Sequence, residues 1–344
     1  MKIIVDAMGG DNAPLEIVRG ALDANRNHGV EIILVGRTAE VLKAVEACGQ
    51  KSLPAGVEIK DAKEVVEIAD DPAMAFKQKP DSSLTVGLNL LKDGAGDAFV
   101  SAGSTGALLS GATLVVKRIR GIRRAAMGPQ IPTAGGRAVL CDCGANAECT
   151  PEYLLQFAYL GSYYAQRVMG IEKPRVGLLN NGTEETKGPQ LQREAYALLT
   201  QAGQAGILHF VGNTEAREVP LGQVDVIVCD GYAGNVLLKS IEGTAMFMGS
   251  MMKRMFQKNL LTKLGALCCK SGIDEMMAML DYREVGGTAL LGIRKPVIKA
   301  HGSSDPRAFR SAIRQAMEAA RQDMTMELEQ SLQRLAGLKE MMES

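Results

Sequence analysis

Six short apolar segments of this chain end in loops that are rich in Gly, Ser, Asn and Asp, and a helical pattern follows most of these loops. Strands that alternate with helices predict an α/β fold with mainly parallel sheets. Ligands of such folds bind outside the carboxyl ends of the strands. Small loop residues let the backbone approach a ligand, and the helix N-termini beyond them favour an anion. The pattern therefore predicts one cleft for a phosphate or carboxylate, formed by the ends of the segments Lys2–Asp6, Asp97–Ser101, Arg137–Asp142, Val176–Leu179, Val224–Asp230 and Val297–His301.

The most informative of these loops follows Val176–Leu179. It begins with Asn180, Asn181 and a Gly, which form a turn signal, and continues with two carboxylates and Lys187 before the next helical pattern. A solvated loop would also be polar, so this loop gains its meaning from the recurrence of the pattern along the chain. We expect Asn180, Asn181, Glu184 and Lys187 to lie at the cleft.

The order of elements is strand, helix, strand, helix throughout, and the length of 344 residues suggests two lobes. Helices are predicted over Pro14–Asn27 and Pro151–Arg167, and a long last helix from Pro306 keeps an apolar helical period as far as Leu335. We expect a first lobe formed by residues 1–135 and 300–344 and a second lobe formed by residues 136–299. The predicted strands, besides the first segment, are Glu31–Val35, Gly56–Lys60, Asp97–Ser101, Ala138–Asp142, Val176–Leu179, Ile207–Val211 and Val224–Cys229.

Composition excludes several classes of function. Basic and acidic residues balance at 39 each, and the chain has 4% aromatic residues and no Trp, which argues against nucleic-acid binding. No secretory signal is evident, the seven Cys lack the C-x-x-C spacing of metal or redox sites, and no apolar run reaches the roughly 20 residues of a membrane span. We expect a soluble, intracellular protein without a metal or cofactor.

Familiar catalytic signatures are absent from the sequence. There is no G-x-G-x-x-G motif, no G-x-S-x-G nucleophile motif, and the segment Gly182–Lys187 lacks the second Gly of a P-loop. Of the three His residues only His301 lies at a strand end, where it could line the cleft or have a purely structural role.

Two further segments have an unusual distribution of charge. Lys117–Arg124 carries five positive charges in eight residues, as a solvated helix end or a docking site for an acidic partner would. Met246–Ile273 combines a Met- and Leu-rich apolar face with basic residues alone. That pattern is typical of a helix lying on an anionic membrane surface, although a core or dimer helix remains the alternative.

Several motifs extend along nearly the whole chain, as Val5–Pro14, Ser101–Ala107, Gly144–Asn146, Leu154–Ala158, Asn180–Gly188, Cys229–Val236 and Ala300–Asp305. Together they resemble the bacterial acyl-ACP:phosphate acyltransferase (PlsX) family. The resemblance implies a two-lobed fold, Rossmann-like and of three α/β/α layers, similar to phosphate acetyltransferases and isocitrate-dehydrogenase-like enzymes. It also implies a homodimer that associates peripherally with the inner face of the cell membrane and passes acyl phosphate to a membrane acyl-phosphate:glycerol-3-phosphate acyltransferase.

The reaction that the resemblance implies is attack of inorganic phosphate on the thioester of an acyl chain carried by acyl carrier protein. Phosphate is already an anionic nucleophile, so the protein has to orient it and stabilise the oxyanion. We expect Lys187 and Asn235 to be catalytic, and Asp142 and Asp230 either to orient Lys187 or to cap turns. The residues expected to bind phosphate and substrate are Asp6, Asn12, Ser101, Ser104, Thr105, Asn146, Asn181, His301 and Ser303. Those expected to dock the carrier protein are Arg118, Arg120, Arg123 and Arg124. Those expected to contact the membrane are Met252, Phe256, Leu260, Leu261 and Leu264.

Two other functions remain alternatives. A phosphate acetyltransferase acting on small acyl-CoA would not need the long Met- and Leu-rich segment. A non-catalytic membrane scaffold would not need six polar strand-end loops. A decarboxylating dehydrogenase is disfavoured because the sequence has neither a clear adenine-binding motif nor an evident metal-carboxylate cluster.

Overall fold

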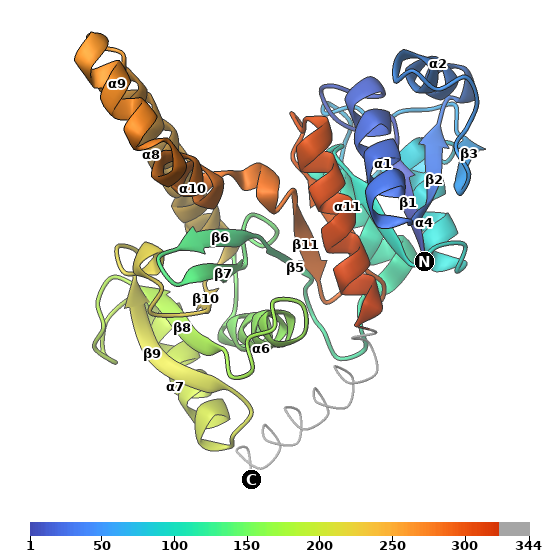
Figure 1. Cartoon of the computed structure of the whole chain (residues 1–344). Coiled ribbons are helices and arrows are strands. Elements are labelled where there is room, and N and C mark those ends of the chain that lie inside the picture. Colours follow the sequence, from blue (N-terminus) through green and yellow to red (C-terminus); the bar gives the residue numbers. More distant parts are fainter. Residues whose placement is uncertain (323–344) are drawn as a thin grey trace.

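The computed structural model describes residues 1–322, without the side chains of Leu280 and Tyr282. These residues form two β-sheets covered by helices, and a helical hairpin that projects from the second sheet (Figure 1). The α/β prediction with mainly parallel sheets is therefore confirmed.

The first sheet has seven strands in the order β3-β2-β1-β4-β12-β11-β5. The first five run parallel, whereas β11 runs antiparallel to both of its neighbours. The carboxyl ends of β1, β4 and β12 therefore lie side by side at one edge of the sheet. The strands are β1 (Lys2–Asp6), β2 (Glu31–Gly36), β3 (Val57–Asp61), β4 (Ala98–Ser101), β5 (Ala126–Gly128), β11 (Gly287–Leu291) and β12 (Val297–Ala300).

Alternate residues of the first sheet are buried under different helices, as the two-residue period of a strand requires. Ile3 and Val5 face the layer of α1 and α11, whereas Ile4 lies with the apolar residues of α4 and α5. The helices of this lobe are α1 (Leu15–His28), α2 (Thr38–Ala47), α3 (Ala75–Gln78), α4 (Ser83–Lys92), α5 (Thr105–Gly111), a π-helical turn η1 (Ala112–Lys117) and α11 (Pro306–Arg321).

The second sheet has five strands in the order β6-β7-β10-β8-β9, parallel except for β6. One face packs on α6 and α7, and the other packs on the first turns of α8 through Leu237. The elements are β6 (Gln130–Thr133), β7 (Gly136–Cys141), β8 (Arg175–Asn180), β9 (His209–Glu215), β10 (Val226–Val228), α6 (Pro151–Arg167), α7 (Gln190–Gln204) and the short 3-10 turns η2 (Val219–Leu221) and η3 (Tyr282–Glu284).

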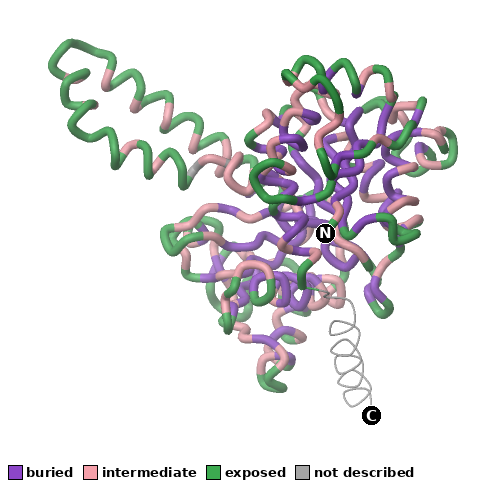
Figure 2. The backbone as a smooth tube through the Cα atoms, turned by 45° about the vertical axis from the view of Figure 1, so that its right-hand side comes forward, coloured by how far each residue is buried: buried purple, intermediate pink, exposed green. Residues whose placement is uncertain are grey.

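The hairpin consists of α8 (Gly231–Phe256), α9 (Leu260–Cys268) and α10 (Lys270–Leu280). It extends away from both lobes and is exposed along most of its length (Figure 2). Many of the exposed side chains are apolar, among them Met246, Leu260 and Leu261, which are 77%, 75% and 79% exposed. None of the helices within residues 1–322 is long and apolar enough to cross a membrane.

The sequence predicted the parallel strands and missed β5, β6 and β11, which are short or antiparallel. The predicted last helix begins at Pro306 as expected, and its continuation to Leu335 lies outside the described residues. Because β6 belongs to the second sheet and β11 and β12 to the first, we propose lobe boundaries at about residues 129 and 286 rather than 135 and 300.

Candidate active site

Three loops meet at the carboxyl edge of the first sheet. The backbone N–H of Asp11, after β1, donates to the carbonyl of Gly302, after β12, at 2.8 Å. A Cβ at Gly9 would lie 2.7 Å from the backbone nitrogen of Gly103, so the loops after β1 and β4 touch through glycine backbone. Asn12 extends the same contact, since its Nδ2 lies 3.4 Å from the carbonyl oxygen of Ser303.

Asp6 and Ser101 hold two of these loops together from inside the protein. The Asp6 carboxylate accepts the backbone N–H groups of Met8 and Gly9 at 3.2 and 3.1 Å and the Ser101 hydroxyl at 2.6 Å. Ser101 Oγ in turn accepts the N–H of Gly103 at 3.0 Å. Burial raises the pKa of Asp6, and its hydrogen bonds oppose that rise. Both side chains are buried, so they shape the loops that would face a ligand.

Asp142 and Asp230 have the corresponding role at the second sheet. Asp142 is fully buried and accepts the backbone N–H groups of Met127, Cys143 and Asn146 at 2.6–2.7 Å, while Asp230 caps α8 by accepting the N–H of Ala233 at 2.8 Å. Burial raises the pKa of Asp142. We expected Asp142 and Asp230 either to orient Lys187 or to cap turns. Their hydrogen bonds to backbone N–H groups support the second role for both.

Asn146 joins this network rather than the cleft surface. Its side-chain Nδ2 donates to the carbonyl of Ala125 at 2.9 Å, and its own carbonyl accepts the N–H of Gly231 at 2.7 Å. The first turn of α8 is thereby held against the loop that follows β7.

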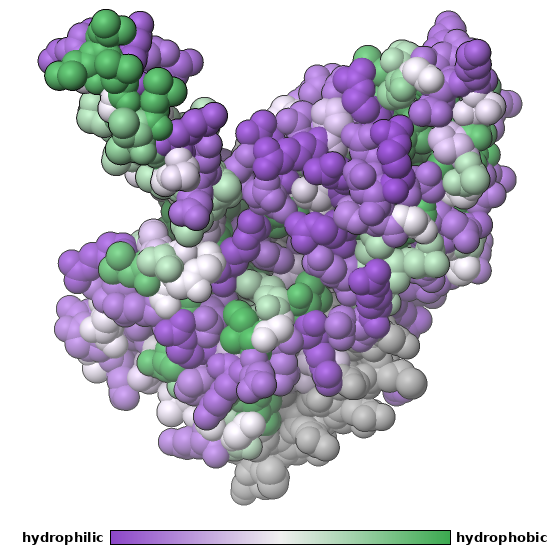
Figure 3. Space-filling view, in the orientation of Figure 1, coloured by the Kyte–Doolittle hydropathy of each residue, from purple (hydrophilic) through white to green (hydrophobic). Residues whose placement is uncertain are grey.

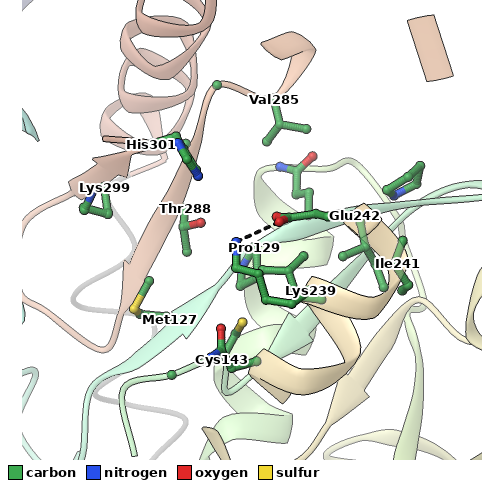
Figure 4. A pocket seen from close by; sticks show the side chains of 18 of the residues that line it. Met127, Pro129, Cys143, Lys239, Ile241, Glu242, Val285, Thr288, Lys299 and His301 are labelled. Carbon is green, nitrogen blue, oxygen red and sulfur yellow. Dashed lines mark hydrogen bonds and ion pairs between the residues drawn. The ribbon is translucent and has the colours of Figure 1, made fainter. Parts of the chain in front are cut away.

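A cavity of about 440 Å³ lies between the two sets of loops (Figure 4). The first lobe contributes Thr105, Lys299 and His301, and the second contributes residues of the β7 loop and one side of α8. Lys239 and Glu242 form an ion pair of 2.7 Å on that side of α8. The principal polar lining residues are Thr105, Gln130, Arg137, Asn235, Lys239, Glu242, Thr288, Lys299 and His301.

Lys299 is the buried cation of this cavity and was not among the predicted site residues. It is 9% exposed, and its Nζ donates to the carbonyls of Ala102 and Ala300. Burial of the ammonium group lowers its pKa to about 8, although the charges of Asp6 and Asp11 oppose this shift. A signal was present in the sequence, because Lys299 is the one charged residue of the apolar segment Val297–Ala300, and lysine is rarely buried.

His301 also lines the cavity, and Ser303 fixes its ring. The backbone N–H of Ser303 lies 3.3 Å from Nδ1, and the Ser303 hydroxyl lies 2.9 Å from the same atom. Burial, together with the nearby positive charges of Lys239 and Lys299, lowers the pKa of His301. The imidazole is therefore neutral at pH 7, with Nδ1 as an acceptor.

Other predicted residues are more distant from the cavity surface. Of the predicted substrate and catalytic residues, Thr105, Asn235 and His301 line it. Ser104 instead caps α5 through the N–H of Ala107 at 3.5 Å. Lys187 and Asn181 are exposed on the loop after β8, where the Asn180 side chain holds the carbonyl of Lys187 at 3.2 Å. Because β8 neighbours β10, this loop and the start of α8 share one edge of the second sheet.

Cys143 is the thiol of the cavity lining, and its environment argues against a nucleophilic role. Burial raises its pKa to about 12, so the thiolate is absent at neutral pH. Within the described part of the chain, no three His, Cys, Asp or Glu side chains gather in a way that could hold a metal ion. The arrangement instead offers cations, an amide and small loops to an anion.

Two α/β lobes with such a cavity between their strand ends define a class of α/β proteins whose ligands bind at the carboxyl ends of the strands. Solved structures with this fold include a phosphotransacetylase from Streptococcus pyogenes, with a TM-score of 0.61, 20% identity and 94% coverage of both chains. A branched-chain phosphotransacylase from Enterococcus faecalis has a TM-score of 0.56 and 16% identity, over 93% of this chain and 99% of that one. At these identities the similarity shows the fold alone.

Residues 1–327 match the family model described as "Fatty acid synthesis protein". Proteins named phosphate acyltransferase are similar along almost the whole chain. The one from Thermoanaerobacterium thermosaccharolyticum is 44% identical over 97% of both chains, and the one from Desulfitobacterium hafniense is 46% identical over 99% of this chain and all of that one. The chain therefore belongs to this family, and the predicted class of enzyme, a phosphate acyltransferase of lipid synthesis, is confirmed.

Proposed function

We propose that the enzyme converts acyl-[acyl-carrier-protein] and inorganic phosphate to acyl phosphate and free carrier protein. The observation that supports this most directly is the interlobe cavity, whose lining combines Lys239, Lys299 and Asn235 with a neutral thiol at Cys143. Such a site suits an anion that is itself the nucleophile, without a covalent enzyme intermediate.

In the proposed reaction a phosphate oxygen attacks the thioester carbonyl carbon. The carbonyl oxygen becomes a tetrahedral oxyanion, the C–S bond then breaks, and the carrier thiolate takes the proton of the attacking P–O–H group. The protein contributes orientation and charge compensation, which are the main terms for such a step. Loss of one oxyanion donor typically lowers the rate about 10²–10³-fold.

We assign the residues of the cavity to these tasks according to their positions. Lys299, in β12, and Thr105, the first residue of α5, bind phosphate. Asn235, in the first turns of α8, donates to the carbonyl oxygen or to phosphate. Lys187, on the exposed loop beside this edge, compensates the negative charge of the incoming substrates.

The first test is phosphate-dependent release of carrier thiol from palmitoyl-[acyl-carrier-protein], compared with palmitoyl-CoA and acetyl-CoA. We expect release that requires phosphate, prefers the carrier-linked substrate and falls at least about 100-fold in Lys187→Ala and in Asn235→Ala. Lys63→Ala is the matched control, because Lys63 is exposed and is distant in sequence from Lys187 and Asn235. Preference for acetyl-CoA would replace this proposal by a phosphate acetyltransferase, and full activity of both variants would reject the assigned roles.

The carrier protein is acidic, and an exposed arginine cluster lies in the chain just before β5, which contributes a residue to the cavity lining. Arg120, Arg123 and Arg124 are exposed immediately before β5, whose Met127 lines the cavity, and the Arg124 guanidinium lies 5.8 Å from the ring centre of Tyr153. Arg118 is less exposed and donates to the carbonyl of Arg123. We propose that this cluster docks the carrier protein.

Reversal of charge in this cluster tests the docking proposal. Arg123→Glu/Arg124→Glu should raise KM for the carrier substrate about ten-fold or more and should weaken its dependence on salt. Arg26→Glu, at an exposed arginine on α1, should leave KM unchanged. Equal KM values for all three proteins would remove the cluster from the docking site.

We propose further that the tip of the hairpin rests on a membrane surface, where acyl phosphate is passed to a membrane acyltransferase. Leu260, Leu261 and Leu264 are exposed at and near the start of α9, after the last turn of α8, which carries Lys253 and Arg254. Figure 3 shows apolar surface gathered on the hairpin. Met252 and Phe256 are half-buried, so they contribute less apolar surface. Leu260→Glu/Leu261→Glu should abolish co-sedimentation with anionic liposomes, whereas Ile68→Glu, at an exposed apolar residue outside the hairpin, should not.

A homodimer would place two hairpins in one particle and would cover part of the same apolar surface. We propose this assembly, and light scattering of the intact protein decides it. A monomeric mass at micromolar concentration would reject the dimer while leaving the membrane proposal to the liposome test.

A further inference from the structure

A second cavity, of about 620 Å³, lies at the base of the hairpin, between α8, α10 and the edge of the second sheet. Five of its lining side chains are methionines, and Arg217 is the one charged residue among the described residues that line it. Methionine is flexible and polarisable, so surfaces rich in it adapt to apolar ligands of varied shape. The lining residues include Pro132, Leu237, Ile241, Ala245, Met248, Met252, Met276, Met277 and Met279.

This methionine cavity adjoins the active-site cavity. Pro132, Ile241, Ala245 and Met279 line both of them. Along α8 the active-site lining runs from Asn235 to Ala245, and the methionine cavity continues from Ile241 through Met248 to Met252. Residues 241, 245, 248 and 252 have the three- and four-residue spacing of a single helix face, so the two cavities follow one side of α8 in succession.

We propose that the methionine cavity binds the hydrocarbon chain of the acyl substrate, with the thioester at Asn235 and the chain running along α8 toward Met248. This inference rests on the proposed function and adds the place in the protein where the hydrocarbon chain of the substrate lies. A volume of about 620 Å³ lies within the roughly 300–1,000 Å³ range of ligand pockets. An apolar lining next to a polar reacting centre matches the two halves of such a substrate.

The length of α8 sets the chain length that this path accommodates. The helix rises about 1.5 Å per residue, so the path from Asn235 to Met248 is about 20 Å long. An extended peptide advances about 3.6 Å per residue, that is, over three backbone bonds. An extended hydrocarbon chain therefore advances about 1.2 Å per C–C bond. The path therefore holds about 16 carbons, and the part before Ala245 holds about 12.

Two other occupants would also cover this apolar surface, namely the hairpin of a second copy and the membrane itself. The shared lining with the active-site cavity favours the acyl chain, because neither of the other occupants requires that connection. The three occupants differ in what they predict for a variant at the junction of the cavities.

The test variant is Ala245→Phe, which places a large side chain where the two cavities join. Met246→Phe, at the adjacent and exposed residue of α8, is the matched control. The measurement is kcat/KM for octanoyl- and palmitoyl-[acyl-carrier-protein] in the intact enzyme, with liposome co-sedimentation and mass by light scattering measured on the same samples.

We expect the parent and Met246→Phe to prefer the sixteen-carbon chain, because each buried methylene adds up to about four-fold in affinity. In Ala245→Phe the ratio of palmitoyl to octanoyl activity should fall at least ten-fold, with octanoyl activity retained. An unchanged ratio, or a change confined to liposome binding or mass, would overturn the acyl-chain proposal and assign the surface to the membrane or the second copy.

A second variant keeps the test decisive where Ala245→Phe is inactive with both substrates. Met248→Ala/Met252→Ala lengthens the far end of the cavity and should raise the ratio of stearoyl to palmitoyl activity several-fold. No shift in that ratio would overturn the proposal. If the parent enzyme releases no carrier thiol from any of these substrates, the proposed function fails instead, and the two failures are thereby distinguishable.

Discussion

Replacing Lys299 by Met should stabilise the protein at neutral pH and impair its use of phosphate. Lys299 is 9% exposed in β12, and burial lowers its pKa from 10.5 to about 8. A lowered pKa means that folding disfavours the charged form. At pH 7 the ammonium is charged in both states, so the fold bears the full cost of burying it.

The magnitude follows from the pKa values. A pKa difference of about 2.5 corresponds to about 3 kcal/mol, at 1.36 kcal/mol for each pKa unit. The Lys299→Met substitution would remove this cost but would also leave the carbonyls of Ala102 and Ala300 without the Nζ donor, which costs about 0.5–1.5 kcal/mol for each bond. The variant should therefore be about 1 kcal/mol more stable than the parent at pH 7.

The sign of this difference should reverse at high pH. Between about pH 8 and pH 10.5 the unfolded chain binds the Lys299 proton while the folded protein has released it, so the stability of the parent rises with pH. Above that range the cost has vanished and only the lost hydrogen bonds distinguish the variant, which should then be the less stable protein by about 2 kcal/mol.

Urea unfolding of both proteins from pH 7 to pH 10.5 measures the difference directly. A difference in the free energy of unfolding that stays constant with pH would refute the reasoning, because it would mean that the buried amine does not titrate differently in the two states. In the same preparations KM for phosphate should rise about 10–100-fold, as expected on loss of one hydrogen bond to a charged ligand.

Other variants test how the two edges of the cleft are built. Gly234→Ala should lower the free energy of unfolding by about 3 kcal/mol, because its Cβ would lie 2.0 Å from the backbone oxygen of Asp142. Gly243→Ala is the control in the same helix, and its new Cβ has no atom within 4 Å. This second variant should raise the free energy of unfolding by up to about 1 kcal/mol, as measured by thermal or urea unfolding. Asp225→Asn should lower it by about 1–2 kcal/mol at pH 7. Burial of the Asp225 carboxyl raises its pKa, but hydrogen bonds from Arg175 outweigh burial and leave the pKa below 3.8. The stability that this pair contributes is therefore present above that pH and is lost as the pH falls. The Asp225→Asn variant should accordingly lose less stability in acid than the parent does.

The sequence predicted the architecture because its signals are local. Runs such as Lys2–Asp6 and Val176–Leu179 are apolar, short and bounded by turn residues, and the structure places strands at both. The antiparallel β5, β6 and β11 lack that signal: each has three to five residues, and their pairing depends on segments far away in the chain, as in the pairing of β5 with β11.

The composition of the cleft was predictable, but the task of each residue was not. Asp6, Asp142 and Asp230 lie at or just beyond strand ends, and Lys299 and His301 flank the last residue of β12. The aspartates nevertheless accept backbone N–H groups, while Lys299 and His301 line the cavity. Neighbouring residues of a strand point in opposite directions, so a shift of one position decides between a loop brace and a ligand contact. Only the relative placement of the two sheets resolves this choice.

Three proposals concern the helix α8: the reaction near its start, acyl-chain binding along it, and membrane binding beyond its end. Because these sites lie at different positions along one helix, variants at each position can test them separately. α8 begins at Gly231, beside the reacting centre, and ends at Phe256, close to the hairpin tip, over about 38 Å. If its two ends act independently, Leu260→Glu/Leu261→Glu should lose liposome binding with an unchanged ratio of palmitoyl to octanoyl activity. Ala245→Phe should show the converse, a lowered ratio with normal liposome binding. Loss of both properties in either variant would mean that the chain path and the membrane surface are a single apolar site.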